Sequence, residues 1–380
     1  MDTAPGRPPA SRLEPDAGLQ GDGDEVVGET SRDRHGDDEL RAWLVAHGVD
    51  PDDIDTLVGE GRVEALASDL VLDRGAELSA REVAAQAGVG LGKVVGTFHD
   101  LGVAVADLDA PQFTRHDVVF VQRMSQAAGL GIVQGPDLLR VVAGSMERIA
   151  EAAVAVYVQG PEEDLRRRWA SVFDCARSNM LATELALDLG AGLGPVFRHH
   201  MRQAVTRQRV IQEGVTRREL ARLAIGFVDL VGSTALQAGL DPAALGEQVS
   251  RFEARAFDVT AAGGGRIVKF IGDAIMIAAV DPVAGVRIVA DLVAAFTDDG
   301  TQPRGGLVFG EVLFRHGDYY GPVVNLAARL VDAAIPGEAL VDGSVVTALK
   351  DDDVVFEPAG RRMLKGFATP VPVWSLATEP

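Results

Sequence analysis

The chain has 380 residues and a single cysteine, Cys175, so it holds no intrachain disulfide and fits a reducing cytoplasm. Its formal net charge of -20 argues against a general affinity for nucleic acid or anionic membranes, and an anionic ligand would need locally placed cations. The hydrophobic fraction of 47% is that of a globular protein, and the length suits two domains.

The first part of the chain lacks the composition of a folded domain. Residues 1–36 are rich in Asp, Glu, Gly and Pro, and they predict a disordered acidic tail. They contain no apolar core of a signal peptide. Apolar stretches such as Ile149–Val158 are far shorter than the roughly 20 residues that span a bilayer. We therefore expect a cytoplasmic protein with no membrane segment.

Residues 37–193 show helical periodicity throughout and little β-branched alternation, which predicts an all-helical regulatory domain. Within it, residues 78–101 have a helix-turn-helix pattern. Ser79 and Glu82 form a capping box at the start of its first helix, and Gly88 ends that helix.

The second helix of this pair tests an alternative function, that of a non-catalytic DNA-binding regulator. A DNA reader normally carries a cluster of Arg and Lys on its recognition helix. Here only Lys93 and His99 could contact phosphates or bases. We expect a structural helix pair, and DNA binding stays the alternative.

A basic helical connector is predicted over residues 194–218. It is dense in arginine and contains the pair His199-His200, and six of the seven histidines of the chain precede the catalytic part. Histidine is the side chain that titrates near neutral pH. A connector that is helical in one state and broken in another would let the helical domain set a pH response.

Residues 219–380 change to an α+β pattern. Their elements follow the order β-α-β-β-α-β, which predicts a ferredoxin-like sheet with helices on one face. The predicted elements are a strand at 223–228, a helix at 241–262, a hairpin at 266–271 and 274–280, a helix at 282–296, a strand at 306–315, a helix at 322–334, and short strands near Ala339 and Val371.

Two aspartates follow or interrupt apolar strands of this part. Asp229 ends the first strand, and Asp273 lies in the hairpin turn that the β-α-β-β order brings beside that strand end. Two carboxylates brought together repel unless a divalent cation bridges them, and Mg²⁺ prefers such oxygen ligands together with substrate phosphates. The tight turn at Gly232, Ser233 and Thr234 offers N–H groups to a phosphate.

Three segments of this part resemble the signatures of class III nucleotidyl cyclases. They are residues 227–234 (Phe-Val-Asp-Leu-Val-Gly-Ser-Thr), residues 269–273 (Lys-Phe-Ile-Gly-Asp) and residues 317–330, which run from Gly-Asp-Tyr-Tyr-Gly to Asn-Leu-Ala-Ala-Arg-Leu. The resemblance covers roughly residues 219–376. The organisation of the whole chain is similar to that of the actinobacterial, mycobacterial-type pH-sensing soluble adenylyl cyclases.

The resemblance implies a role for each residue of the motifs. Two ions, Mg²⁺ or Mn²⁺, would bind Asp229 and Asp273. The remaining roles are purine selection by Lys269 and Asp318, ribose orientation and transition-state stabilisation by Asn325 and Arg329, and a grip on the β- and γ-phosphates by Lys365.

The family's site lies across the interface of a homodimer, with the metal aspartates from one protomer and the purine selectors, Asn325 and Arg329 from the other. All six positions are intact on this chain. The Lys and Asp selectors imply ATP as substrate, while another purine specificity stays the alternative. The Gly-Gly-Asp/Glu-Glu-Phe signature of diguanylate cyclases is missing from the hairpin, and the intact motif residues disfavour an inactive cyclase-like protein.

Overall fold

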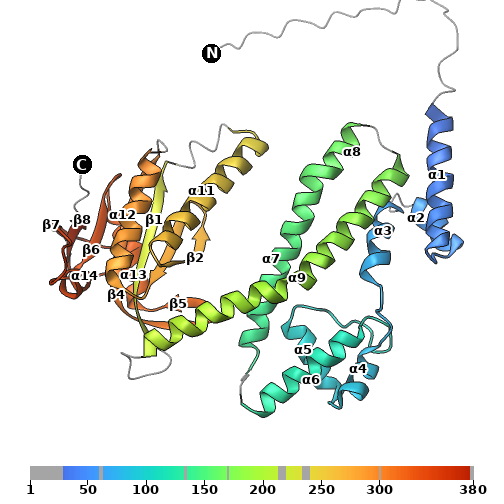
Figure 1. Cartoon of the computed structure of the whole chain (residues 1–380), viewed down its shortest axis with the longest axis horizontal. Helices are drawn as coiled ribbons and strands as arrows, with labels where there is room; N and C mark the ends of the chain where they lie inside the picture. The colour runs from blue at the N-terminus through green and yellow to red at the C-terminus, as the bar shows by residue number, and fades with distance from the viewer. Residues whose placement is uncertain are drawn as a thin grey trace, which may run out of the picture. The chain divides into compact units, whose positions relative to one another are not determined.

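The computed structural model describes residues 29–59, 63–131, 135–168, 171–212, 220–232, 240–298 and 301–376. The chain divides into two compact units. The first, Met1–Val133 with Val142–Ala191, is helical, and the second, Gln134–Val141 with Gly192–Pro380, contains the sheet (Figure 1).

The helical part consists of short helices followed by two long ones. They are α1 (Glu29–Ala46), α2 (Pro51–Gly59), α3 (Val63–Leu72), α4 (Ala80–Ala87), α5 (Leu91–Asp100), α6 (Arg115–Gly129), α7 (Asp137–Tyr157), a π-helical turn (Val158–Glu162), α8 (Glu163–Arg167) and α9 (Val172–Gln212). The prediction of a tail as far as residue 36 is wrong for its last part, because α1 begins at Glu29. Leu40 and Leu44 anchor this helix in a core, and it extends from them toward the N-terminus. Residues 1–28 of the predicted tail lie outside the described residues.

The helical unit has two small cores. Leu40, Leu44 and Ile54 pack with residues of α3 and α9 in one of them, and α4, α5 and α6 enclose the other around Val83 and Phe98. Neither core is large enough to stabilise a large domain alone. Each core therefore stabilises its own group of helices.

The predicted helix pair is confirmed, including its caps. The Ser79 hydroxyl accepts a hydrogen bond from the Glu82 N–H, and the Glu82 carboxylate accepts one from the Ser79 N–H at 2.8 Å. Gly88 ends α4 in the left-handed conformation, with φ of 68°. These local signals were sufficient to predict both ends of the helix.

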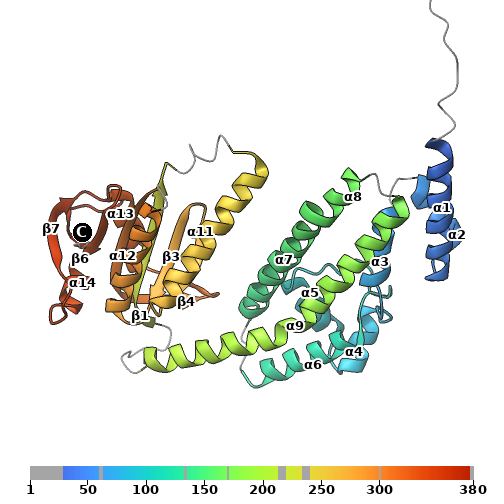
Figure 2. The same cartoon turned by 45° about the horizontal axis from the view of Figure 1, so that its top comes forward.

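The connector is not a separate element, because α9 is one helix of 41 residues that passes through the predicted boundary at 193/194 (Figure 2). Pro195 lies inside it, next to Gly190, Gly192 and Gly194. Residues 213–218 of the predicted connector lie outside the described residues.

The prediction of no membrane segment is set against one long helix of the structure. One described helix, Val172–Val210, is long and apolar enough to cross a membrane by length and composition, with a mean hydropathy of 1.3 in its best window. Glu184 interrupts this stretch, and its carboxylate accepts a hydrogen bond from Arg74 of α3 at 2.8 Å. That ion pair is a contact within the helical unit.

The second unit contains all strands of the sheet. Its elements are β1 (Leu220–Val231), α11 (Pro242–Ala262), β2 (Arg266–Ile271), β3 (Ala274–Ala279), α12 (Pro282–Asp298), β4 (Gln302–Arg315), β5 (Asp318–Tyr320), α13 (Pro322–Ala333), β6 (Ala339–Asp342), α14 (Gly343–Ala348), β7 (Phe356–Arg362) and β8 (Val371–Leu376). The strand order is β2-β3-β1-β4-β6-β8-β7, and β5 pairs with β4. The order of β2, β3, β1 and β4 is that of the predicted ferredoxin-like unit.

Both faces of the sheet are covered, which corrects the prediction of helices on one face. Even-numbered residues of β1 such as Ala224 and Val228 pack in the core that α12 covers, while Leu223, Ile225 and Phe227 pack in the core that includes α13. β1 is therefore apolar almost without alternation, and an uninterrupted apolar strand is buried on both sides.

A close approach of backbones fixes α13 against β4. A side chain added at Gly306 of β4 would place its Cβ 2.6 Å from the Val331 nitrogen and 2.7 Å from the Ala327 oxygen. Only glycine fits there. This contact sets the distance between the sheet and α13, the helix that carries Asn325 and Arg329.

Candidate functional site

The first half of the site is a corner where β1 ends beside the β2–β3 turn. Asp229 lies opposite Ala274 in the β1–β3 ladder, and Asp273 directly precedes Ala274. The predicted proximity of the hairpin turn to the end of β1 is therefore confirmed. Within the described ranges no group of three or more His, Cys, Asp or Glu side chains forms, so this corner supplies two carboxylates to any cation. Two carboxylates together with substrate phosphates fit Mg²⁺ or Mn²⁺.

Sequence reasoning missed a third charged residue of this corner, Arg304 of β4. It lies opposite Asp229 in the β1–β4 ladder. Its Nη2 and Nε atoms donate to the same carboxylate oxygen, Asp229 Oδ2, at 2.6 and 3.0 Å. The two side chains are only 24% and 20% exposed, so the ion pair is partly withdrawn from water. We call Asp229, Asp273 and Arg304 the metal corner, after the role predicted for the two aspartates.

The second half of the site joins two predicted purine selectors. Lys269 Nζ donates to Asp318 Oδ2, although 49 residues separate the two along the chain. Lys269 comes from the edge strand β2 and is 42% exposed, and Asp318 opens β5 and is 21% exposed. The other carboxylate oxygen of Asp318 accepts from the Tyr319 N–H at 2.8 Å, which orients the group. We call Lys269 and Asp318 the purine corner, after the role predicted for them.

Asn325 and Arg329 lie one turn apart on α13, as predicted. Asn325 is exposed, and Arg329 donates to Asp332 Oδ2 at 2.8 Å. The carbonyl oxygen of Asp332 in turn accepts from Arg304 Nη1 at 3.1 Å. The C-terminal turn of α13 is thus tied to the metal corner through Arg304.

Comparison with known proteins decides the family. The chain is 36% identical over 329 residues to an uncharacterized protein of Mycobacterium tuberculosis, covering 84% of this chain and 85% of that protein. It is 31% identical to an adenylate cyclase of Glutamicibacter nicotianae, over 73% of this chain and 72% of that one. It is 30% identical to a pH-sensitive adenylate cyclase of M. tuberculosis, over 86% and 84%. The chain belongs to the class III adenylate cyclases.

No family model matches this cyclase. Among solved structures, the adenylyl cyclase CyaB of P. aeruginosa is 25% identical and aligns with 42% of this chain and 96% of its own, at a TM-score of 0.38. Family membership rests on the sequence relatives.

The remaining predicted site residues of the cyclase are less constrained. Gly232 follows β1 in a turn with φ of 82°, a left-handed conformation that favours glycine. Ser233 and Thr234 lie outside the described residues. Lys365 is exposed in the turn between β7 and β8, and a lysine there is accessible to a phosphate.

The connector ends beside the purine corner. Burial, followed by the neighbouring Arg266 guanidinium, lowers the pKa of Arg207 on α9. Arg266 also lies over the ring of Tyr319, 4.9 Å from its centroid. Tyr319 directly follows Asp318, so these contacts bring Arg207 of α9 next to the strand that begins with a predicted purine selector.

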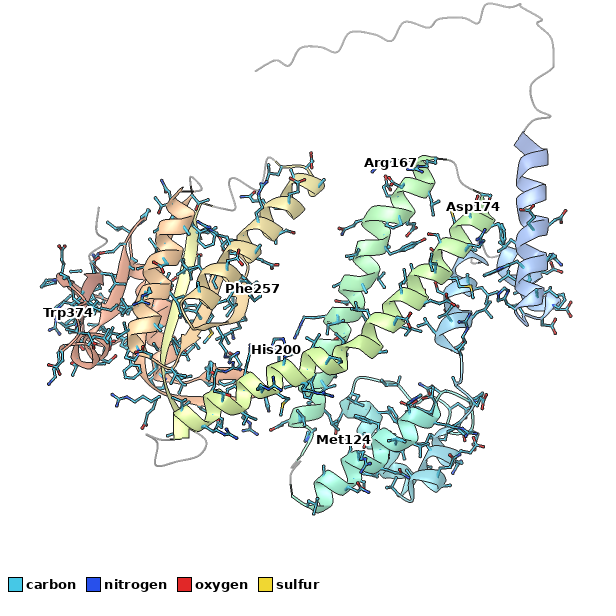
Figure 3. The ribbon with its side chains drawn as sticks, viewed as in Figure 1. Met124, Arg167, Asp174, His200, Phe257 and Trp374 are labelled. Atoms are coloured by element: carbon cyan, nitrogen blue, oxygen red, sulfur yellow. The ribbon has the colours of Figure 1, made fainter. Side chains whose placement is uncertain are left out.

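Three histidines bear on the predicted pH response. His199 and His200 are exposed on α9, and His200 is labelled in Figure 3. His316, which was not among the predicted sensors, lies in the β4–β5 turn with its Nε2 3.0 Å from Asp137 Oδ2. Hydrogen bonds from His316 and then Arg315 lower the pKa of the Asp137 carboxyl. Asp137 is the first residue of α7 and belongs to the second unit, as does the β4–β5 hairpin that contains His316 and Asp318.

The structure adds no support for the alternative function of a DNA-binding regulator. Lys93 and His99 are exposed on α5, and His99 lies 3.9 Å from the carboxylate of Asp100. The described surface of α5 has no other Lys, Arg or His.

Proposed function

We propose that the chain converts ATP to 3′,5′-cyclic AMP and pyrophosphate. The observation that carries this proposal is the contact between Lys269 and Asp318, because the family uses these two positions to recognise adenine. Asp318 would accept from the adenine amino group, and Lys269 would donate to a ring nitrogen. A guanine edge presents the reverse pattern at the amino position, so this pair disfavours GTP.

The metal corner supplies the ligands for the catalytic ions. Asp229 and Asp273 would hold two divalent cations, Mg²⁺ or Mn²⁺. Such cations lower the pKa of a bound hydroxyl and neutralise charge on phosphate oxygens. The protein itself contributes position: Asn325 orients the ribose, and the Arg329 guanidinium stabilises charge on the α-phosphate. Lys365 binds the β- and γ-phosphates.

A C₂ homodimer would complete two sites from two chains. The catalytic unit carries exposed apolar side chains that a second copy would cover, and the set is Val249, Phe257, Ile271, Leu313, Phe314 and Tyr320. Phe257, marked on α11 in Figure 3, is 54% exposed. Apolar surface of this kind supports an interface between subunits.

The decisive assay incubates the purified chain with ATP or GTP and Mn²⁺ and separates the nucleotides. We expect cyclic AMP from ATP and little product from GTP. Equal turnover of the two nucleotides would contradict the purine assignment, and no cyclic product would contradict the activity.

Mixing two inactive variants tests the shared site. A dimer of Asp273→Ala with Arg329→Ala has one site that carries both lesions and one that carries neither. About half of a random mixture is heterodimer, so roughly a quarter of all sites should recover. No recovery after demonstrated subunit exchange would place each site within one chain.

We further propose a cytoplasmic enzyme whose helical domain sets a pH response through α9. The pH-sensitive relative and the exposed pair His199-His200 support this. Replacing both histidines with Asn should flatten the rate-against-pH profile of the full chain. His99→Asn, on the separate helix α5, is the matched control. An unchanged profile in the double variant would remove these two residues as sensors.

A further inference from the structure

Two cationic side chains of the edge strand β2 contact two consecutive residues of β5. Lys269 donates to the Asp318 carboxylate, as described above. The Arg266 guanidinium lies over the ring of Tyr319, with its Cζ 4.9 Å from the ring centroid. The proposed reading of the purine does not account for this second contact, although it adjoins a residue on which that reading depends.

A β-bulge in β2 places the two cationic side chains on the same face of the sheet. Arg266 and Lys269 are three residues apart, a spacing that puts the side chains of a regular strand on opposite faces. Here their partners on β3, Ala278 and Met276, are only two residues apart, because β2 carries one extra residue between them. Both partners belong to the core cluster that includes Tyr319. Bulges next to active sites redirect side chains in this way.

The ring of Tyr319 is held from two sides. It is 7% exposed and packs against the ring of Phe314, its partner in the β4–β5 ladder, with 5.3 Å between the centroids. Arg266 covers it from β2, and a guanidinium over an aromatic face is a stabilising contact. None of the described ion pairs includes Arg266, and the nearby Arg207 carries the same charge, so the ring is its favourable partner.

The ring is connected directly to the purine selector. The Tyr319 N–H donates to Asp318 Oδ1 at 2.8 Å, so the position of Tyr319 sets the direction of the carboxylate. β5 has only three residues, and its described ladder is with β4. When Lys269 turns to a ring nitrogen of the base, as the proposed function requires, its contact with Asp318 weakens. The contact between Arg266 and Tyr319 then still joins β2 to β5.

We propose that Arg266 is a positioning residue for the purine selector Asp318, acting through the ring of Tyr319. This rests on the proposed function, in which Asp318 accepts from the adenine amino group. Without the Arg266 guanidinium, β5 is free to shift when the base binds, and the amino group loses a well-directed acceptor. The groups proposed to bind ribose and phosphates lie on other elements, so their contacts should remain.

The test compares ATP with purine riboside 5′-triphosphate, an analogue that lacks the amino group. With the full chain and Mn²⁺, it measures kcat and KM for ATP and the inhibition constant of the analogue against ATP. Arg266→Met and Arg266→Gln both lose the charge. In each, KM for ATP should rise about 3–30-fold, while kcat and the inhibition constant stay within about twofold of the wild type. A general disturbance of the site would weaken the binding of both nucleotides.

Conservative variants and a matched control complete the test. Arg266→Lys keeps a cation and Tyr319→Phe keeps a ring, so both should stay within about threefold of the wild-type KM for ATP. Arg222 lies over the ring of Phe309 in the same sheet, 4.8 Å from its centroid. Arg222→Met therefore removes the same kind of contact elsewhere, and it should leave both constants unchanged.

An unchanged KM for ATP in the two charge-free variants would overturn the proposal, and so would an equal rise in that KM and in the inhibition constant of the analogue. Asp318→Ala separates this outcome from a failure of the proposed function. If it leaves the ratio of the two constants unchanged, Asp318 does not read the amino group, and the purine assignment fails. If Asp318→Ala raises that ratio and the Arg266 variants do not, only the role of Arg266 fails.

Discussion

The metal corner and the purine corner each pair a carboxylate with a cation, but the two pairs are built differently. Asp229 and Arg304 face each other in a ladder of two long strands, and both side chains are at least three-quarters buried. Lys269 and Asp318 come from an edge strand and a strand of three residues, and Lys269 is 42% exposed. The first pair is fixed by the sheet. The second depends on its side chains alone, as the proposed exchange of one partner for a base requires.

The largest effect should come from the metal corner. Asp229→Ala or Asp273→Ala removes a proposed metal ligand, and we expect turnover to fall by at least about 1,000-fold while the protein stays folded. Cyclic AMP production and circular dichroism check the two parts of this statement. Asp258→Ala, an exposed aspartate of α11, is the control. Near-normal turnover in either variant would contradict the metal assignment.

The purine corner should give a smaller, substrate-specific effect. Lys269→Glu combined with Asp318→Cys leaves the adenine edge unpaired, at about 1–3 kcal/mol for each lost partner. We expect kcat/KM for ATP to fall by about 100-fold. The same two changes in the exposed neighbours Lys350 and Asp351 are the control. Unchanged ATP efficiency would show that the corner does not contact the purine.

Gly306 tests the packing that positions α13, the helix of Asn325 and Arg329. In Gly306→Ala the new Cβ meets backbone atoms of α13, which cannot rotate away, so the helix must shift. We expect about 1–3 kcal/mol of lost stability and about a tenfold loss of kcat. Gly246→Ala, with open space around its Cβ in α11, should cost neither. A fully active Gly306→Ala variant would mean that catalysis does not depend on the distance of α13 from the sheet.

The smallest effect concerns Asp342. Its carboxylate accepts a hydrogen bond from the Ser344 hydroxyl, whereas the carboxylates of the two corners pair with cationic side chains. Burial raises the pKa of Asp342, and hydrogen bonds such as that from Ser344 lower it only in part. A raised pKa means that the ionised carboxylate costs stability at neutral pH, and that this cost disappears as the pH falls. Asp342→Asn should therefore raise the melting temperature at pH 7 by the equivalent of up to about 1 kcal/mol, and should do nothing below about pH 4.

Asp351→Asn, whose side chain is 87% exposed, controls for the change of net charge. A gain for Asp342→Asn that persists at low pH would show that its cause is not the charge.

The sequence predicted the parts of the fold that depend on local signals. The capping box of α4 and the strand-turn-strand pattern that brings Asp273 beside Asp229 were both confirmed. Short elements were missed, because the three residues of β5 carry no periodicity and β7 contains Pro358 and Gly360. A strand signal needs several alternating residues.

Arg304 could not be predicted for a different reason. Its role depends on which residue of β1 it opposes, and that register is set by the whole sheet rather than by neighbours in sequence. A buried aspartate predicts that some cation lies nearby, but it does not say which one. The position of α13 on the second face likewise required the packing at Gly306.

Mechanically, α9 consists of two stiff helical segments joined by a segment that bends more easily, at residues 190–195. Pro195 has no N–H to give to the carbonyl of Ala191, and Gly190, Gly192 and Gly194 surround it. Together these four residues make the helix roughly 6 kcal/mol less favourable than alanine would. The compliant segment coincides with the division of the chain between Ala191 and Gly192. A torque applied to either end is therefore absorbed there before the intact turns on each side are strained.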